Sequence, residues 1–124
     1  MLIFVYGSLK RGYKYNYVLD NISKFISEVT TVEKFSLYRY KDSDFPYLSL
    51  KENEKVKGEL FEVLNIKDID QLEGYPLFYD RKEIEVETAE GFKYKALVYF
   101  LKEKIKEKEK PIKEWTLKEE RWTS

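Results

Sequence analysis

The sequence begins with MLIFVYGSLKRG, residues 1–12, and this stretch sets the expected fold. Leu2 to Tyr6 form a short apolar run of β-prone side chains, which is typical of a buried strand. Gly7 ends the run, and a glycine there permits a turn with positive φ or the close approach of a ligand to the backbone. We therefore predict a buried first strand that leads directly into a loop.

The loop YGSLKRG, Tyr6 to Gly12, is the first candidate site. A strand that ends in glycine followed by a small hydroxyl residue exposes consecutive backbone N–H groups, and such groups can hold an anion. The pattern lacks the GxxxxGK[ST] spacing of a nucleotide phosphate loop. An ordinary strand exit with a basic turn explains the same residues about equally well, so this loop alone does not identify a function.

The second candidate site is DQLEGYPLFYDR, Asp70 to Arg81. Asn65 can cap a short helix over Ile66 to Glu73, and Gly74 is a stop signal. A carboxylate at a helix C-terminus feels the negative end of the helix dipole, and aromatic neighbours would remove its water. Both effects raise the pKa of Glu73 toward values useful in acid–base catalysis. A solvated glutamate at the end of a helix is the ordinary alternative.

The remaining patterns predict mostly strands. Asn16 to about Ile26 has apolar residues at helical spacing and predicts a short helix or turn. Gly58, inside an otherwise regular strand pattern, marks a bulge or a close backbone crossing. The predicted strands and connections are one or two strands in Glu28 to Tyr40, a polar loop over Lys41 to Asp44, a strand over Val56 to Leu64, and a hairpin of Arg81 to Thr88 with Phe92 to Leu101.

The C-terminal segment changes character after Leu101. The run KEKIKEKEK, Lys102 to Lys110, has one apolar residue, and we predict a mobile loop or a frayed arm. From Pro111 onward Trp115 and Trp122 restore hydrophobicity, so this tail is predicted to dock on the body or on a second subunit, which would give a homo-oligomer. The expected organisation is one domain over residues 1–124, with a core of about 1–101 and the charged loop and docked tail over 102–124.

Composition excludes several kinds of chemistry. The chain of 124 residues has the size of one domain and contains neither cysteine nor histidine. Disulfides, thiol nucleophiles, Ser-His-Asp triads and imidazole bases are therefore excluded, and no carboxylate cluster at metal-ligand spacing is visible. Catalysis would depend on carboxylates, hydroxyls, amines and backbone groups. We predict no metal and no cofactor. The abundance of Lys and Glu is a bias typical of proteins from hot environments.

Charge and hydropathy restrict the partners and the location. Lys plus Arg and Asp plus Glu number 23 each, so the chain has no global field that would attract nucleic acid or an anionic membrane. The many Tyr and Phe residues leave a barrel that stacks single-stranded nucleic acid as a weaker alternative. No run of about eighteen apolar residues appears, and the N-terminal basic residues follow the apolar stretch, the reverse of a secretory signal. A cytoplasmic protein is expected.

Three motifs together resemble a known family. YGSLKRG, VKGELFEV and LEGYPLFYDR, in this order, resemble the γ-glutamyl cyclotransferase superfamily and within it the AIG2-like and γ-glutamylamine cyclotransferase branch. The resemblance covers about residues 1–100. It implies an α+β fold, a small mixed β-barrel with short peripheral helices, and the cofactor-free release of 5-oxoproline from a γ-glutamylamine or γ-glutamyl peptide.

The resemblance also implies the roles of individual residues. Tyr6, Gly7, Ser8 and Leu9 would bind the γ-glutamyl substrate, largely through backbone groups, and Glu73 would be the proton acceptor. The substrate's α-amine would attack its own γ-carbonyl, and Glu73 would pass the proton to the departing amine. Whether the loop holds the oxyanion or the α-carboxylate is left open by the sequence. A non-catalytic module that keeps the pocket for a small ligand or a protein partner is the alternative.

This sequence departs from the family pattern near both motifs. Ser8 stands where the animal γ-glutamylamine enzymes usually carry threonine, which keeps the hydroxyl. Gly74 and Tyr75 differ from the residues that follow the glutamate in those enzymes. The pocket wall, and with it the choice of substrate, is therefore expected to differ.

Overall fold

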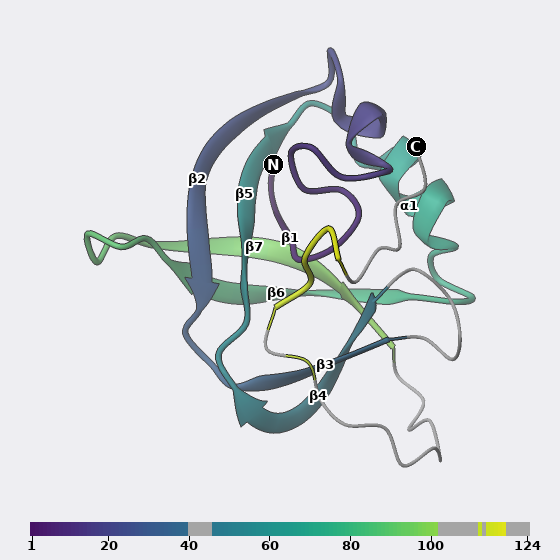
Figure 1. Cartoon of the computed structure of the whole chain (residues 1–124). Coiled ribbons are helices and arrows are strands. Elements are labelled where there is room, and N and C mark those ends of the chain that lie inside the picture. The colour runs from purple at the N-terminus through teal and green to yellow at the C-terminus, as the bar shows by residue number, and fades with distance from the viewer. Residues whose placement is uncertain (40–45, 102–111, 113, 119–124) are drawn as a thin grey trace.

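The structure is a computed structural model that describes residues 1–39, 46–101, 112 and 114–118. Five of the described strands form a closed barrel in the order β1-β5-β2-β6-β7, and β3 and β4 form a separate two-stranded sheet (Figure 1). The elements are β1 (Leu2–Val5), the 3₁₀ helix η1 (Asn16–Leu19), β2 (Ser23–Thr31), β3 (Phe35–Arg39), β4 (Pro46–Glu54), β5 (Lys57–Val63), α1 (Lys67–Glu73), β6 (Asp80–Glu87) and β7 (Lys93–Phe100).

The barrel is mixed because β1 has one antiparallel and one parallel neighbour. It pairs antiparallel with β5 and closes the barrel through a parallel pairing of Ile3 with Leu97 in β7. The β3–β4 sheet connects to the end of β7, where the Leu101 N–H donates to the Leu48 carbonyl at 3.0 Å. The predicted fold, a small mixed barrel with short peripheral helices, is confirmed.

Strand β1 is buried on both faces, which explains its continuous apolar sequence. Phe4 belongs to a cluster that fills the barrel interior and draws on all five barrel strands. Ile3 and Val5 belong to a second cluster, which packs against Leu19 of η1 and Ile69 of α1. The first strand is therefore inserted between two cores, and its direction fixes where the following loop emerges.

Gly58 allows β5 to pass close to β1. A Cβ at this position would lie 2.3 Å from the Val5 carbonyl oxygen and 2.6 Å from Cε1 of Phe4. Neither the backbone oxygen nor the buried ring can give way cheaply. The close backbone crossing predicted from the isolated glycine is confirmed.

The helices are short and lie on one side of the barrel (Figure 1). The prediction of a helix or turn from Asn16 to about Ile26 is correct only for its first part. Asn21 takes a positive φ of 65°, and β2 begins at Ser23. Pairing with β5 and the edge-on contact of Phe25 with Phe61, with centroids 5.6 Å apart, outweigh the helical spacing. No helix in the described part of the chain is long and apolar enough to cross a membrane.

The pattern over Val56 to Leu64 and the hairpin at 81–101 correspond to β5 and to β6 with β7. Strand β4 was not predicted, because only Pro46, Tyr47 and Leu48 of its nine residues are buried and its second half is polar. The loop expected at Lys41 to Asp44 lies outside the described residues.

The tail packs into the chain's own barrel at Trp115. The Trp115 side chain is fully buried in the interior cluster. The backbone carbonyl of Trp115 accepts hydrogen bonds from Lys10 Nζ at 2.5 Å and from the Tyr13 hydroxyl at 3.2 Å. The Ile112 N–H donates to the Leu37 carbonyl of β3 at 2.7 Å. Docking on the body is thus confirmed for Trp115. The predicted mobile loop at 102–110 and the second tryptophan, Trp122, lie outside the described residues.

Because Trp115 is buried, we predict a clear fluorescence signal from its indole ring and a large loss of stability when its side chain is replaced by alanine. In a Trp122→Phe background, native emission should lie to the blue of free indole and move to the red on unfolding in urea. Trp115→Ala should lower the free energy of unfolding by about 3 to 5 kcal/mol. Leu117→Ala, at a side chain that is 45% exposed, is the matched control. Native emission at the wavelength of free indole would contradict the packing.

Candidate active site

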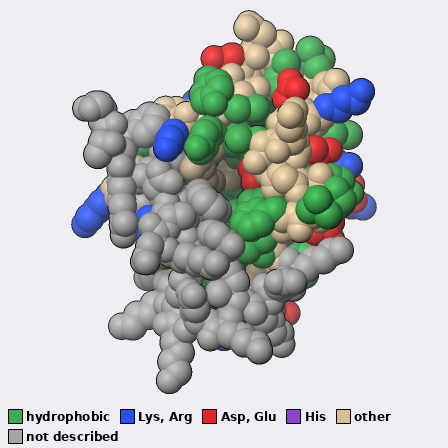
Figure 2. Space-filling view, turned by 90° about the vertical axis from the view of Figure 1, so that its right-hand side faces the viewer, with side chains coloured by type: hydrophobic (Ala, Val, Ile, Leu, Met, Phe, Trp, Pro, Cys, Tyr) green, Lys and Arg blue, Asp and Glu red, His purple; other side chains and the backbone are tan. Residues whose placement is uncertain are grey.

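One cavity brings together all five residues that the sequence singled out. Its volume is about 210 Å³, and Glu73 from the end of α1 faces it together with the loop after β1. Figure 2 looks onto the side of the molecule that carries α1, and hydrophobic side chains border a hollow there. The residues that line the cavity are Phe4, Val5, Tyr6, Gly7, Ser8, Leu9, Tyr15, Pro46, Leu72, Glu73, Phe78, Tyr79 and Tyr99.

The loop after β1 keeps its carbonyl groups occupied and leaves amide groups free. The Gly7 carbonyl accepts from the Lys10 N–H at 3.0 Å, and the Ser8 carbonyl accepts from the Tyr15 N–H at 2.8 Å. In a trans peptide the following N–H points the opposite way, so the N–H groups of Ser8 and Leu9 face away from these bonds. Neither N–H donates to any described residue.

The Ser8 hydroxyl adds a third donor. Its Oγ is buried and has no hydrogen-bond partner within the described part of the chain. A buried hydroxyl without a partner is unfavourable unless a ligand supplies one. Two adjacent amides and this hydroxyl are therefore donors that could hold an anion at the cavity.

Gly7 is required for packing. A Cβ on Gly7 would lie 2.4 Å from Cγ of Pro46, at the start of β4. The Pro46 carbonyl in turn accepts a hydrogen bond from the Tyr79 hydroxyl at 2.7 Å. The glycine thus lets the loop seat against β4, a contact that the sequence prediction of a turn or a ligand approach did not include.

Glu73 is the last residue of α1, which ends at Gly74 in the left-handed conformation with φ of 66°. Burial raises the pKa of its carboxyl group from 4.5 to about 7, because the charged form loses its water. No described residue forms a hydrogen bond or an ion pair with the carboxylate. The upward direction agrees with the sequence prediction. Near neutral pH this group can both accept and donate a proton.

A network beneath Glu73 anchors α1 to the barrel. Asp70, one turn earlier on the helix, accepts from Arg81 Nη1 at 3.0 and 2.9 Å and from the Tyr99 hydroxyl at 2.5 Å. Burial, and then the bond to Asp70, raise the pKa of Tyr99, so its phenol stays protonated and keeps donating. These contacts join α1 to β6 and β7 and fix the position of Glu73.

Sequence reasoning did not assign roles to this network. Asp70 and Arg81 begin and end the motif DQLEGYPLFYDR, and opposite charges at the two ends of a motif were the available signal. Tyr99 gave no such signal, because it lies in another strand and only the closed barrel brings it to Asp70.

Tyr6 faces the cavity with its ring, and its hydroxyl is already engaged. The hydroxyl donates to the Tyr99 carbonyl at 2.8 Å and accepts from the Leu48 N–H at 3.1 Å. Burial raises the pKa of Tyr6 well above its usual range, and the charge of Glu73 adds to the effect. Tyr6 therefore joins β1 to β4 and β7, and its single donor is not available to a ligand.

The basic residues of the first motif serve the fold. Lys10 is buried and donates to the Trp115 carbonyl. Arg11 donates its backbone N–H to Glu59 Oε1 at 2.7 Å and its Nε to Oε2 at 3.2 Å, and its guanidinium lies over the ring of Phe25. Neither residue lines the cavity, so the donors that the loop offers there are uncharged.

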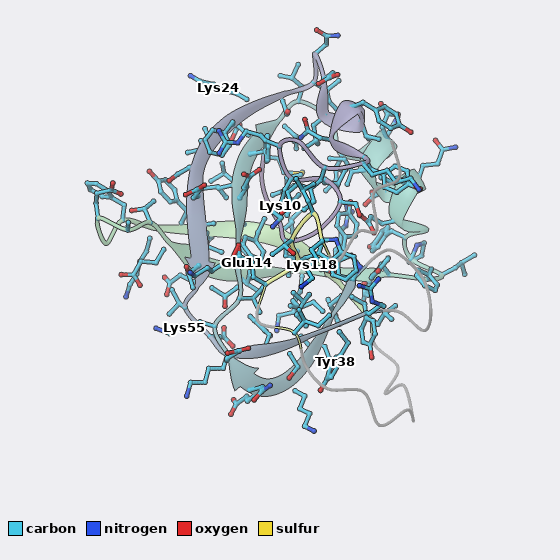
Figure 3. The ribbon with its side chains drawn as sticks, in the orientation of Figure 1. Lys10, Lys24, Tyr38, Lys55, Glu114 and Lys118 are labelled. Atoms are coloured by element: carbon cyan, nitrogen blue, oxygen red, sulfur yellow. The ribbon has the colours of Figure 1, made fainter. Side chains whose placement is uncertain are left out.

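A second cavity, of about 400 Å³, lies apart from the predicted site. Lys10, Lys55 and Glu114, labelled in Figure 3, contribute to it, and none of the five predicted site residues lines it. Its lining carries charges of both signs. In the described ranges no three Asp or Glu residues cluster as metal ligands would.

Comparison with known proteins gives consistent matches. The family model "Gamma-glutamyl cyclotransferase, AIG2-like" matches residues 3–124. A Methanocaldococcus jannaschii protein named "Putative gamma-glutamylcyclotransferase" is 38% identical over 106 residues, covering 82% of this chain and 84% of that protein. A Drosophila melanogaster protein of the same name is 33% identical, covering 65% of this chain and 57% of that protein. The crystal structure of an AIG2-like protein from Mus musculus superimposes with a TM-score of 0.86 at 26% identity, covering 93% of this chain and 87% of that one.

The raised pKa of Glu73 predicts a pH-dependent gain in stability for Glu73→Gln. The pKa of Glu73 is about 7 in the folded state and 4.5 in the unfolded state. Between pH 4.5 and about 7 the folded state therefore binds more protons than the unfolded state, and the stability of the wild type falls as the pH rises through this range. Removing the charge should stabilise the fold at pH 8.5 by up to about 3 kcal/mol, and the gain should shrink as the pH falls toward the unfolded value. Urea unfolding across this range measures the effect.

Glu83→Gln is the matched control, because Glu83 is exposed on β6. It should change stability little at any pH in this range. A gain for Glu73→Gln that does not vary with pH would show that the carboxyl group has an ordinary pKa.

Proposed function

We propose that this chain, which belongs to the AIG2-like gamma-glutamyl cyclotransferase family, releases 5-oxoproline from a γ-glutamyl compound. One observation carries the proposal: a single cavity unites a carboxyl group whose pKa is about 7 with a loop that presents three unpaired donors. The first suits proton transfer, and the second suits an anion. A γ-glutamyl substrate needs both, because it carries an α-ammonium and an α-carboxylate on one carbon.

The reaction needs proton transfer and positioning. The α-ammonium gives a proton to Glu73, and the resulting amine attacks the γ-carbonyl carbon to form a carbon–nitrogen bond. Glu73 returns that proton to the nitrogen of the leaving amine, whose bond to the carbonyl carbon then breaks. The ring nitrogen loses its second proton to Glu73, which releases it to solvent. Because the attack is intramolecular, holding the chain folded back removes much of the barrier.

The pKa of Glu73 makes the first step accessible. A terminal α-amine has a pKa of about 8, so transfer to an ordinary glutamate at about 4.3 would cost about 5 kcal/mol. With Glu73 at about 7 the gap is about one unit, or about 1.4 kcal/mol. Burial of this carboxyl group thus supplies most of the match that general base catalysis requires.

We assign the loop donors to the α-carboxylate of the substrate. This group is charged throughout the reaction, and a buried charge without partners is costly. No Lys or Arg occurs among the described residues that line the cavity. The N–H groups of Ser8 and Leu9 and the Ser8 hydroxyl are then the donors that hold it, and this places the α-amine within the cavity that Glu73 lines.

Glu73→Gln should lower kcat/KM for 5-oxoproline release by about a hundredfold or more, because the amide keeps the shape but cannot accept a proton. In the wild type, kcat/KM should rise with pH as the carboxyl group loses its proton near pH 7, and it should fall again above about pH 8, where the substrate loses the ammonium proton that Glu73 transfers. The assay uses a panel of γ-glutamyl amines and γ-glutamyl peptides. Glu83→Gln, at an exposed glutamate, is the control and should keep full activity.

Two outcomes would contradict this part of the proposal. Activity of Glu73→Gln within about threefold of wild type would remove Glu73 from the mechanism. Failure of every γ-glutamyl compound to yield 5-oxoproline, together with calorimetric binding of the same compounds, would favour the non-catalytic binding module.

Ser8→Ala separates the two possible roles of the loop. If the Ser8 hydroxyl holds the α-carboxylate in substrate and transition state alike, KM should rise about tenfold or more while kcat changes little. Ser27→Ala removes a hydroxyl that bonds only to the neighbouring backbone on β2 and serves as the control. A large fall in kcat at constant KM would instead assign this hydroxyl to the developing oxyanion.

A further inference from the structure

The carbonyl groups of the loop after β1 are all held by the loop itself and by the segment that follows it. The carbonyls of residues 7–10 accept, in order, from the Lys10 N–H at 3.0 Å, the Tyr15 N–H at 2.8 Å, Asn16 Nδ2 at 2.8 Å and the Tyr13 N–H at 3.0 Å. Three of these donors are backbone groups that every residue except proline supplies. Asn16 is the exception, because its donor is a side chain at the start of η1.

The hydrogen bond from Asn16 connects to the amide of Ser8 through two peptide groups. Asn16 Nδ2 donates to the Leu9 carbonyl. The N–H of the same peptide group belongs to Lys10 and donates to the Gly7 carbonyl. The peptide group of the Gly7 carbonyl ends in the N–H of Ser8. Because the carbonyl and the N–H of a trans peptide point in opposite directions, these bonds form one chain from the Asn16 side chain to the Ser8 N–H.

A chain of this kind affects its last donor in two ways. It fixes the direction of the Ser8 N–H, and each hydrogen bond polarises the next one, which makes the terminal N–H a stronger donor. The Ser8 N–H donates to no described residue, and Ser8 lines the cavity, so the chain ends there. Asn16 is not among the residues that line the cavity, and it can therefore act on a ligand only through the loop.

We propose that Asn16 is a positioning residue for the carboxylate-binding donors of the loop. Through the peptide groups of Leu9 and Gly7 it holds the Ser8 N–H toward the cavity and strengthens that N–H as a donor. The inference rests on the proposed function, in which the Ser8 N–H binds the α-carboxylate of a γ-glutamyl substrate. Asn16 then serves binding and not proton transfer, because Glu73 belongs to a different element, α1.

Asn16→Leu tests the assignment, because leucine is similar in size and has no donor. We expect KM for 5-oxoproline release to rise about fivefold or more, because the donor to a charged group is weakened. The kcat, and the rise of kcat/KM near pH 7, should stay close to those of the wild type. A purely structural role would give a different result, since a partly unfolded enzyme loses kcat and keeps its KM. Asn16→Ala, which adds no apolar bulk, should show the same rise.

Asn65→Leu is the matched control. The side chain of Asn65 also bonds to the backbone, since its Oδ1 accepts from the Lys67 N–H at 2.8 Å. It lies before the start of α1, whereas Glu73 is the last residue of that helix. Its replacement should leave KM and kcat unchanged. Thermal unfolding of all three variants measures how much folded enzyme each assay contains. An unchanged KM in both variants of Asn16 would overturn the inference.

The wild-type protein provides a second test, which needs no substitution. NMR titration with 5-oxoproline, the product of the proposed reaction, presents the α-carboxylate to the loop. Binding should shift the N–H resonance of Ser8, and through the chain it should also shift the side-chain NH₂ resonances of Asn16. The side-chain NH₂ resonances of Asn65 should stay in place. A shift at Ser8 without one at Asn16 would also overturn the inference.

The failures of the inference and of the proposed function are distinguishable. Wild-type turnover of γ-glutamyl compounds, with an unchanged KM in the variants of Asn16, would remove the inference and leave the cyclotransferase activity in place. Coupled shifts at Ser8 and Asn16 without any turnover would support the positioning role and favour the non-catalytic binding module. No 5-oxoproline from any γ-glutamyl compound, together with no shift at Ser8, would count against the proposed function itself.

Discussion

The burial of β1 on both faces is the constraint on which the rest of the site depends. Phe4 packs into the barrel interior, while Ile3 and Val5 pack toward the helices. A strand held from both sides, paired to β5 and β7, has no freedom to shift. The loop therefore emerges at one fixed place, where the Tyr6 hydroxyl bridges Tyr99 and Leu48. The position of the N–H and hydroxyl donors of the loop therefore follows from the packing of β1.

The carboxyl group of Glu73 is held at a buried position that disfavours its charged form, while the neighbouring Asp70 is well paired. The raised pKa of Glu73 reflects lost hydration and no local partner. The hydrogen bonds of Asp70 to Arg81 and Tyr99 hold α1 in place. The guanidinium of Arg81 also pairs the carboxylate of Asp70 with a cation. An unpaired Asp70 one turn away would oppose ionisation of Glu73 further. The contacts of Asp70 thus stabilise the helix whose last residue carries the buried carboxyl group.

Much of the fold could be predicted from the sequence, but less of the geometry of the site could. Strand β1, the β6–β7 hairpin and the end of α1 at Gly74 were predictable because apolar spacing and glycine act locally. The start of β2 and the whole of β4 were not, since Ser23 is in a strand only through pairing with β5 and the second half of β4 is polar. Glu73 and the loop were identified by combining motifs. Asp70 and Tyr99 required the closed barrel that joins them.

The loop after β1 is anchored at both of its ends, and the tail provides one of the two anchors. Gly7 seats one end against Pro46, and Lys10 fixes the other by donating to the Trp115 carbonyl from a buried position. A buried ammonium is costly unless it is hydrogen-bonded, so the Trp115 carbonyl of the tail helps to offset the charge that Lys10 brings into the loop. Ser8 and Leu9 lie between these two anchors. In the proposed function, donors fixed before the substrate arrives would need no reorganisation to bind it, which is how preorganised sites lower a barrier. Trp115, from the opposite end of the sequence, thus helps to fix the position of this loop.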